Sequence, residues 1–106
     1  MIQKLRAVAV ILLAACLVTP AFAQGSAADT YKAKCASCHG PDGLAATSMA
    51  KAMKVISFKA PEMIKATDAQ FIASTTDGKG KMPAYKGKLT DAQITDVIKY
   101  IRTLQK

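Results

Sequence analysis

The feature that most constrains this chain is a pair of cysteines followed directly by a histidine, in the run Cys35-Ala36-Ser37-Cys38-His39. The 106 residues include three cysteines and one histidine, and the third cysteine is Cys16, near the N-terminus. A structural zinc site takes four nitrogen or sulfur ligands, and this run offers three. A redox-active disulfide is the other alternative, but no βαβ pattern surrounds the run, and the adjacent His39 would be unexplained.

The spacing of this run is that of covalent haem c attachment. Two thiols in this arrangement can form thioethers with the two vinyl groups on one edge of a porphyrin, and the next residue then brings an imidazole nitrogen to the iron. We therefore predict one haem c as the cofactor, Cys35 and Cys38 as its attachment residues, and His39 as an axial ligand of the iron.

The second axial position falls to a methionine, a lysine or water, or it stays empty, because His39 is the one histidine. Three of the methionines, Met49, Met53 and Met63, have apolar neighbours at helical spacing. This pattern is typical of a methionine that fills a gap in the core. Met82 differs, because it follows the polar, Gly-rich run 78–81 and precedes Pro83. Glycines allow a tight backbone path there and the proline stiffens the exit. We expect Met82 to be the ligand; the alternatives are Lys79 or Lys81, or a Met82 that only fills a gap.

Residues 1–23 predict a cleaved export signal. A basic start precedes an unbroken apolar run over residues 7–18, and small residues precede the expected cut after Ala23. The apolar run is too short for a helix across a hydrocarbon layer of about 30 Å. We expect residues 24–106 to form one domain in the periplasm. The alternative is a lipoprotein in which Cys16 carries the lipid.

The chain beyond Ala23 is poor in bulky apolar side chains, with 2 Val, 6 Ile, 3 Leu, 4 Met and 2 Phe beside 3 Tyr. Domains of about 60 to 80 residues are marginal and commonly need a disulfide, a metal or a cofactor to complete the core. We therefore expect a non-protein group at the centre of the fold.

Helical patterns account for the regular structure, and no alternating apolar pattern supports a sheet, so the predicted fold class is all-α. Thr67–Gln70 and Thr90–Gln93 have the form of capping boxes that begin helices. The last helix carries apolar residues at helical spacing. The predicted helices and turns, in chain order, are 26–38, 48–55, 61–65, 67–76 and 90–104.

Taken together, these motifs resemble those of the small monohaem class I c-type cytochromes of bacteria. The resemblance rests on Cys35-x-x-Cys38-His39-Gly40, on Gly78-x-Gly80-x-Met82-Pro83-x-Tyr85 and on a final helix with Tyr100. It implies a cytochrome c fold, with three to five helices around one covalently attached haem. It also implies that the N- and C-terminal helices cross with Tyr31 and Tyr100 in contact, and that Pro83 and Tyr85 pack near the haem on the methionine side.

An iron with both axial positions filled binds no substrate without losing a ligand, so we expect a one-electron carrier and not an enzyme. Its expected role is to shuttle electrons between respiratory or dehydrogenase partners. One alternative is a cytochrome c subunit of a larger oxidoreductase. The other is a haem enzyme or gas sensor whose methionine ligand is displaceable.

The formal charge of +8 indicates the kind of partner. Two expected loops near the haem carry the lysines Lys51, Lys54, Lys59, Lys79, Lys81, Lys86 and Lys88. Lysines arranged around a haem edge steer a carrier toward redox proteins with acidic docking surfaces and give weak, salt-sensitive encounters. We expect a monomer that forms transient complexes and has no small-molecule substrate. The chain has no basic stripe interleaved with aromatic residues, so nucleic-acid binding is not expected.

Overall fold

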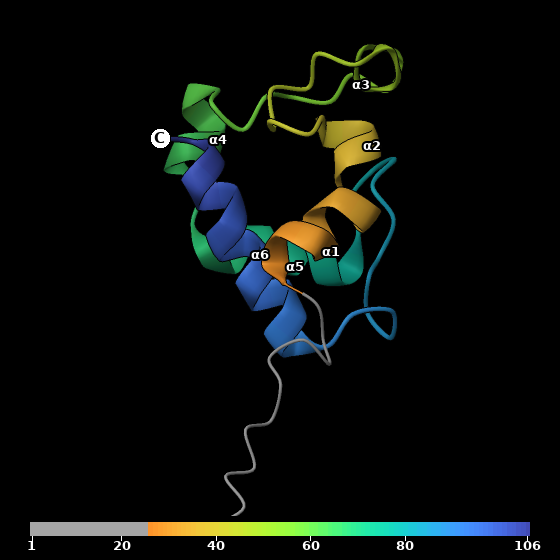
Figure 1. Cartoon of the computed structure of the whole chain (residues 1–106), viewed down its shortest axis with the longest axis vertical. Helices are drawn as coiled ribbons and strands as arrows, with labels where there is room; N and C mark the ends of the chain where they lie inside the picture. Colours follow the sequence, from red (N-terminus) through yellow and green to blue (C-terminus); the bar gives the residue numbers. More distant parts are fainter. Residues whose placement is uncertain (1–25) are drawn as a thin grey trace, which may run out of the picture.

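The computed structural model describes residues 26–106, so the predicted signal of residues 1–23 and Cys16 lie outside the described residues. Within this range the regular elements are helices, with isolated bridges at Lys79–Met82 and Lys86–Leu89. The helices are α1 (Ala27–Lys34), α2 (Ala36–His39), α3 (Ser48–Ala52), α4 (Pro61–Lys65), α5 (Asp68–Asp77) and α6 (Asp91–Leu104), as Figure 1 shows. The all-α prediction is confirmed, and none of these helices is long and apolar enough to cross a membrane.

The helix predicted over residues 26–38 is bent into two, α1 and α2. It begins as expected, with the Ser26 hydroxyl accepting from the Asp29 amide at 3.1 Å. Cys35 then departs from helical geometry, at φ −118°. The bend lets the Tyr31 hydroxyl donate to the Gly40 carbonyl at 2.6 Å. On a straight helix these residues would be about 13.5 Å apart along the axis, beyond the reach of a tyrosine side chain.

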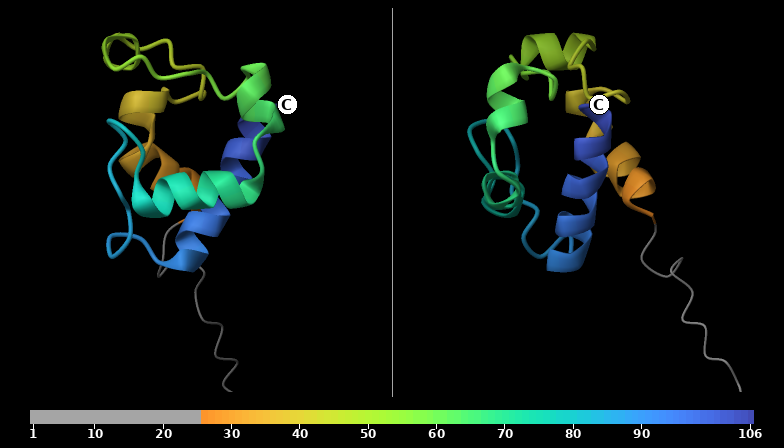
Figure 2. Two further views of the ribbon diagram at one scale, coloured as in Figure 1. Left: turned by 180° about the vertical axis from the view of Figure 1, so that it is seen from behind. Right: turned by 90° about the vertical axis from the view of Figure 1, so that its left-hand side faces the viewer.

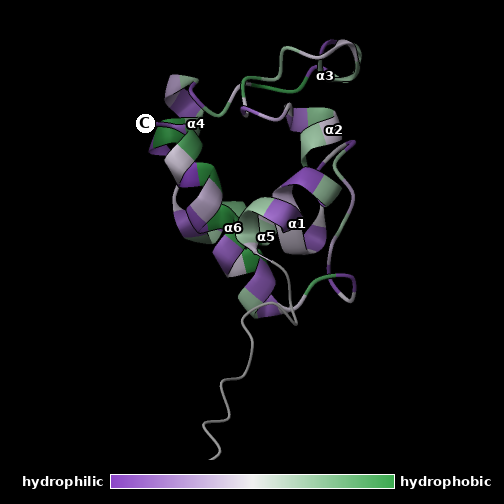
Figure 3. Cartoon of the chain, in the orientation of Figure 1, coloured by the Kyte–Doolittle hydropathy of each residue, from purple (hydrophilic) through white to green (hydrophobic). Residues whose placement is uncertain are grey.

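Helix α6 contributes more buried apolar residues to the core than any other helix, through the face formed by Ile94, Val97, Ile98 and Ile101. Figure 3 shows this helix divided between apolar and polar residues. Helix α1 lies across α6, and the Tyr31 and Tyr100 rings meet with centroids 5.2 Å apart. The contact that the resemblance implied between these tyrosines is therefore confirmed.

Both predicted capping boxes are present. Thr67 and Thr90 each accept from the amide three residues on, at 3.1 Å, and the Gln side chain at that position accepts from the threonine amide. These caps begin α5 and α6, because they satisfy amides that have no partner within the helix. Helix α5 buries Phe71 and Thr75, and the Phe71 ring packs edge-on against Phe58.

Between α2 and α4, residues 44–57 form a projecting loop that includes α3 (Figures 1 and 2). The loop closes at a neck where the Phe58 amide donates to the Gly43 carbonyl at 2.9 Å. Gly43 is required at this neck. It has φ +75°, and a Cβ there would lie 2.8 Å from the Phe58 ring and 3.3 Å from Leu104.

The C-terminal end of α6 holds α4 and its flanking residues by polar contacts. The Arg102 guanidinium donates to the carbonyls of Met63, at 3.3 Å, and Ala66, and it pairs with Asp68 at 2.8 Å. It also lies 4.4 Å from the centre of the Phe71 ring. Gln105 donates to the carbonyls of Phe58 at 2.9 Å and Met63 at 3.3 Å. A helix of one turn has little stability of its own, so these contacts fix its place.

We predict that Arg102→Met lowers the free energy of unfolding by ~2 kcal/mol, because the carbonyls of Met63 and Ala66 lose a charged donor. Asp68→Asn removes the ion pair with Arg102, and because the Asp68 side chain is 62% exposed, the change should cost ~0.5 kcal/mol. Denaturant titration of the haem-loaded protein, followed by circular dichroism, measures both. An equal decrease in the free energy of unfolding in the two variants would show that the contacts of Arg102 with the carbonyls add nothing to the ion pair.

Candidate functional site

The two cysteines lie at the bend between α1 and α2. Cys35 belongs to the core cluster and is 9% exposed, whereas Cys38 is half-buried, and both are free thiols. Burial, with the nearby Cys38 adding to it, raises the pKa of Cys35 to about 11. Its thiol is therefore protonated at neutral pH. The two cysteines of the motif therefore differ in burial.

His39 ends α2 and stacks on Phe58, with ring centroids 4.6 Å apart and ring planes inclined by 16°. Burial lowers the pKa of the imidazole, so the ring is neutral at neutral pH, which is the form that binds a metal. Its Nδ1 atom is buried and has no hydrogen-bond partner within residues 26–106. An unsatisfied buried polar atom is costly, so this ring is suited to a group that the polypeptide does not supply.

The backbone around His39 is held from two sides. The Ala45 amide donates to the His39 carbonyl at 2.9 Å, and Tyr31 donates to the Gly40 carbonyl. Gly40 ends α2 with φ +83°, a conformation that suits glycine. The position of the imidazole therefore follows from the bend, from Tyr31 and from the turn that begins at Gly40.

Met82 lies in the loop between α5 and α6, on a tight turn that it forms with Lys79. The Lys79 amide donates to the Met82 carbonyl at 3.1 Å, and the Met82 amide donates back at 2.9 Å. Gly78 makes the turn possible, because it has φ +77° and a Cβ there would lie 2.8 Å from the Met82 carbonyl oxygen. Met82 is half-buried and Pro83 is exposed. The glycines of this loop thus have the backbone role that the sequence predicted.

Tyr85 joins the Met82 loop to the cysteine segment. Its hydroxyl donates to the Lys34 carbonyl at 2.7 Å, and its amide donates to the Thr75 carbonyl at 2.9 Å. Burial raises the pKa of Tyr85, and the neighbouring Cys35 and Cys38 add to the shift. Figures 1 and 2 show the loop of residues 78–90 running beside α1 and α2. The structure therefore brings the two sequence motifs to one side of the fold.

Two residues near the site were not predicted to belong there. Phe58 provides the stacking surface for His39, and no spacing rule connects it to the cysteine motif. Met53 was interpreted as core filler, but its sulfur lies 3.9 Å from the Cys38 sulfur. Its position directly after α3, four residues beyond Met49, was the available signal. Met53 is therefore the methionine against which the assignment of Met82 has to be tested.

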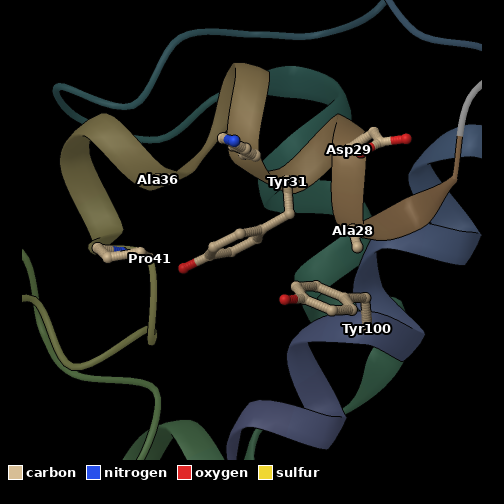
Figure 4. A pocket seen from close by; sticks show the side chains of 7 residues that line it. Ala28, Asp29, Tyr31, Ala36, Pro41 and Tyr100 are labelled. Atoms are coloured by element: carbon tan, nitrogen blue, oxygen red, sulfur yellow. The ribbon is translucent and has the colours of Figure 1, made fainter.

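The alternative zinc interpretation gains no support from the geometry. No three His, Cys, Asp or Glu side chains in the described part of the chain gather closely enough to hold a metal ion. A pocket of about 250 Å³ lies at the crossing of α1 and α6 (Figure 4), and its lining residues are Ala28, Asp29, Tyr31, Lys32, Ala36, Pro41 and Tyr100. No cysteine, histidine or methionine lines it, so none of the predicted attachment or ligand residues faces this pocket.

The surface beside the site is strongly basic. The lysines of the two loops, Lys51, Lys54, Lys59, Lys79, Lys81, Lys86 and Lys88, are all exposed. Among the described residues the salt bridge is Arg102–Asp68, which involves none of these lysines. The loop lysines are therefore available to a partner molecule.

Comparisons with known proteins show which family the chain is similar to. Residues 23–101 match the family model described as cytochrome c oxidase, cbb3-type, subunit III. The chain is 36% identical to cytochrome c6 of Picosynechococcus sp., over 93% of this chain and 92% of that protein. It is 39% identical to cytochrome c6 of Leptolyngbya boryana, over 67% and 80%. Among solved structures, the KustC0563 c-type cytochrome matches with a TM-score of 0.70 and 25% identity, covering 76% of this chain and 99% of that one.

We predict that Gly78→Ala destabilises the protein by ~3 kcal/mol, because the added Cβ meets the Met82 carbonyl in a backbone conformation that disfavours alanine. Gly80→Ala is the matched control in the same loop. Gly80 also has positive φ, but a Cβ there has nothing within 4 Å, so only a backbone cost of ~1 kcal/mol remains. Thermal unfolding of the two variants gives the comparison, and equal melting temperatures would show that the close approach at Gly78 is unimportant.

Proposed function

Because the chain belongs to the class I c-type cytochromes and is a haem c electron carrier, we propose that Cys35 and Cys38 hold the haem covalently and that His39 and Met82 bind its iron. The observation that carries this assignment is the neutral, buried His39 ring with an unpaired nitrogen, next to two free thiols on one helical turn. These groups fit what a haem c requires of a polypeptide.

Each of these residues has a defined task. The bound haem supplies a one-electron couple. The Cys35 and Cys38 sulfurs anchor it, while the bend at Cys35 and the Phe58 ring orient the His39 imidazole. The Met82 thioether is a soft, neutral donor, and such a ligand favours the ferrous state and raises the reduction potential. Tyr85 and Pro83 complete the methionine side, Tyr85 through its hydrogen bond to Lys34.

The protein is an electron carrier and not an enzyme, and its partners are redox proteins. The match to cytochrome c6 over 92% of that protein favours an independent carrier over a subunit of a larger oxidoreductase or a gas sensor. We place it in the periplasm on the basis of the export signal predicted for residues 1–23, with lipid attachment at Cys16 as the alternative.

We predict that Met82→Ala retains haem after acid-acetone extraction, but that its ferrous iron binds carbon monoxide and its reduction potential falls. Loss of the thioether opens an axial position and removes the ligand that stabilises the ferrous state. Met53→Ala and Met49→Ala are the controls, because Met53 contacts the Cys38 sulfur and Met49, on the preceding helix α3, is 52% exposed. If Met53→Ala opens the iron and Met82→Ala does not, the ligand assignment is wrong. Absence of extraction-resistant haem in the unmodified protein would overturn the attachment proposal.

The exposed lysines of the two loops support docking to acidic surfaces by a monomer in transient complexes. Of the acidic residues, Asp42 lies close to the first loop, and Asp77 and Asp91 lie at the ends of the second. An excess of positive charge over this face raises encounter rates with anionic partners and orients them. Because the charges are exposed, salt should screen the effect over about 10 Å at 0.1 M ionic strength.

We predict that Lys81→Glu with Lys86→Glu slows oxidation of the ferrous protein by ferricyanide about threefold to tenfold at low salt. The same variant should react faster with a cationic cobalt phenanthroline complex, and both differences should shrink at high salt. Lys65→Glu with Lys106→Glu makes the same charge change at exposed positions outside the two loops and should have a smaller effect. Equal effects of the two double variants would mean that net charge, and not the loop surface, steers the reaction.

A further inference from the structure

The loop that carries Met82 is joined to the segment before Cys35 by one hydrogen bond across 51 residues of sequence, from the Tyr85 hydroxyl to the Lys34 carbonyl at 2.7 Å. Lys34 is the last residue of α1, and the last carbonyls of a helix have no partner within it. The bend at Cys35 therefore leaves an acceptor that the Tyr85 hydroxyl satisfies.

The backbone of Tyr85 connects the Met82 loop to α5. Its amide donates to the Thr75 carbonyl at 2.9 Å, and the Lys86 amide donates to the Thr76 carbonyl at 3.1 Å. These bonds fix the exit of the loop to the last turns of α5, while Gly78 and the Lys79–Met82 turn fix its entry. Met82 thus lies on a short span whose far end is Tyr85.

We infer that Tyr85 is a positioning residue, whose hydroxyl latches the Met82 loop to the cysteine segment and so limits how often Met82 leaves the iron. This inference rests on the proposed ligation by Met82. Three residues of extended chain reach at most about 10 Å, so Met82 cannot move far while Tyr85 stays attached at both Lys34 and Thr75. Once the hydroxyl bond opens, the loop is held to α5 alone, and such weakly held segments open locally at low free-energy cost.

The test is the rate at which cyanide binds the ferric, haem-loaded protein, because cyanide needs an axial position that Met82 has left. Met82→Ala should bind cyanide fast, since it has no methionine to displace. Tyr85→Phe keeps the ring and loses only the hydroxyl, and we expect it to bind cyanide about three to ten times faster than the unmodified protein, as loss of one neutral hydrogen bond implies.

The matched control is Tyr100→Phe, which removes a hydroxyl from a half-buried tyrosine on α6 whose ring packs on Tyr31. Its cyanide rate should equal that of the unmodified protein. Amide hydrogen exchange gives a second measure that does not depend on the haem spectrum. In Tyr85→Phe the backbone amides at positions 85 and 86 should exchange faster, while those in the middle of α6 should not change.

The two ways in which this can fail are distinguishable. If Met82→Ala binds cyanide fast but Tyr85→Phe behaves like the unmodified protein in both measurements, the latch is wrong and the ligand assignment stands. If Met82→Ala binds cyanide no faster than the unmodified protein, Met82 is not the ligand, and the proposed function of this loop and the latch are both overturned.

Discussion

The site depends above all on the placement of Tyr31, which belongs both to the helix crossing and to the cysteine segment. Its ring is 1% exposed and packs on Tyr100 of α6, while its hydroxyl donates to the Gly40 carbonyl directly after His39. Burial raises the pKa of this hydroxyl, so it remains a donor through the physiological range. The crossing of α1 and α6 therefore also sets the position of α2, and with it Cys38 and His39.

The remaining segments are too short to be stable alone and are held by contacts from the longer helices. Arg102 of α6 and the following Gln105 donate to carbonyls before, within and after α4. Gly43 allows the neck of the α3 loop to close against Phe58 and Leu104. Tyr85 holds the Met82 loop against α1 through its hydrogen bond to the Lys34 carbonyl. A chain with few bulky apolar residues thus uses specific polar contacts to arrange loops around a cofactor. This use of polar contacts is consistent with the small apolar core that the composition predicted.

Local patterns predicted much of this structure. The capping boxes at Thr67 and Thr90 and the apolar spacing of α6 gave α5 and α6 closely, because caps and amphipathic spacing act within a few residues. The bend at Cys35 was missed. The bend allows the hydrogen bond from Tyr31 to Gly40 and accompanies the burial of Cys35, and neither is visible in helix propensity. The approach of Met53 to Cys38 and the stacking of Phe58 on His39 were missed for the same reason, since each joins segments separated by 15 or more residues.

The sequence by itself determined the chemistry available to this protein: two thiols and one imidazole at fixed spacing, one methionine in a Gly-rich loop, and an excess of lysine. Covalent spacing and composition are properties of the chain, and they hold before it folds. Only the tertiary structure decided how these groups are presented. In the folded chain Cys35 is buried and Cys38 is half-buried. The His39 Nδ1 atom is buried without a hydrogen-bond partner in the described residues, and Tyr85 attaches the Met82 loop to α1. Burial and long-range hydrogen bonds depend on segments distant in sequence, so no local pattern encodes them.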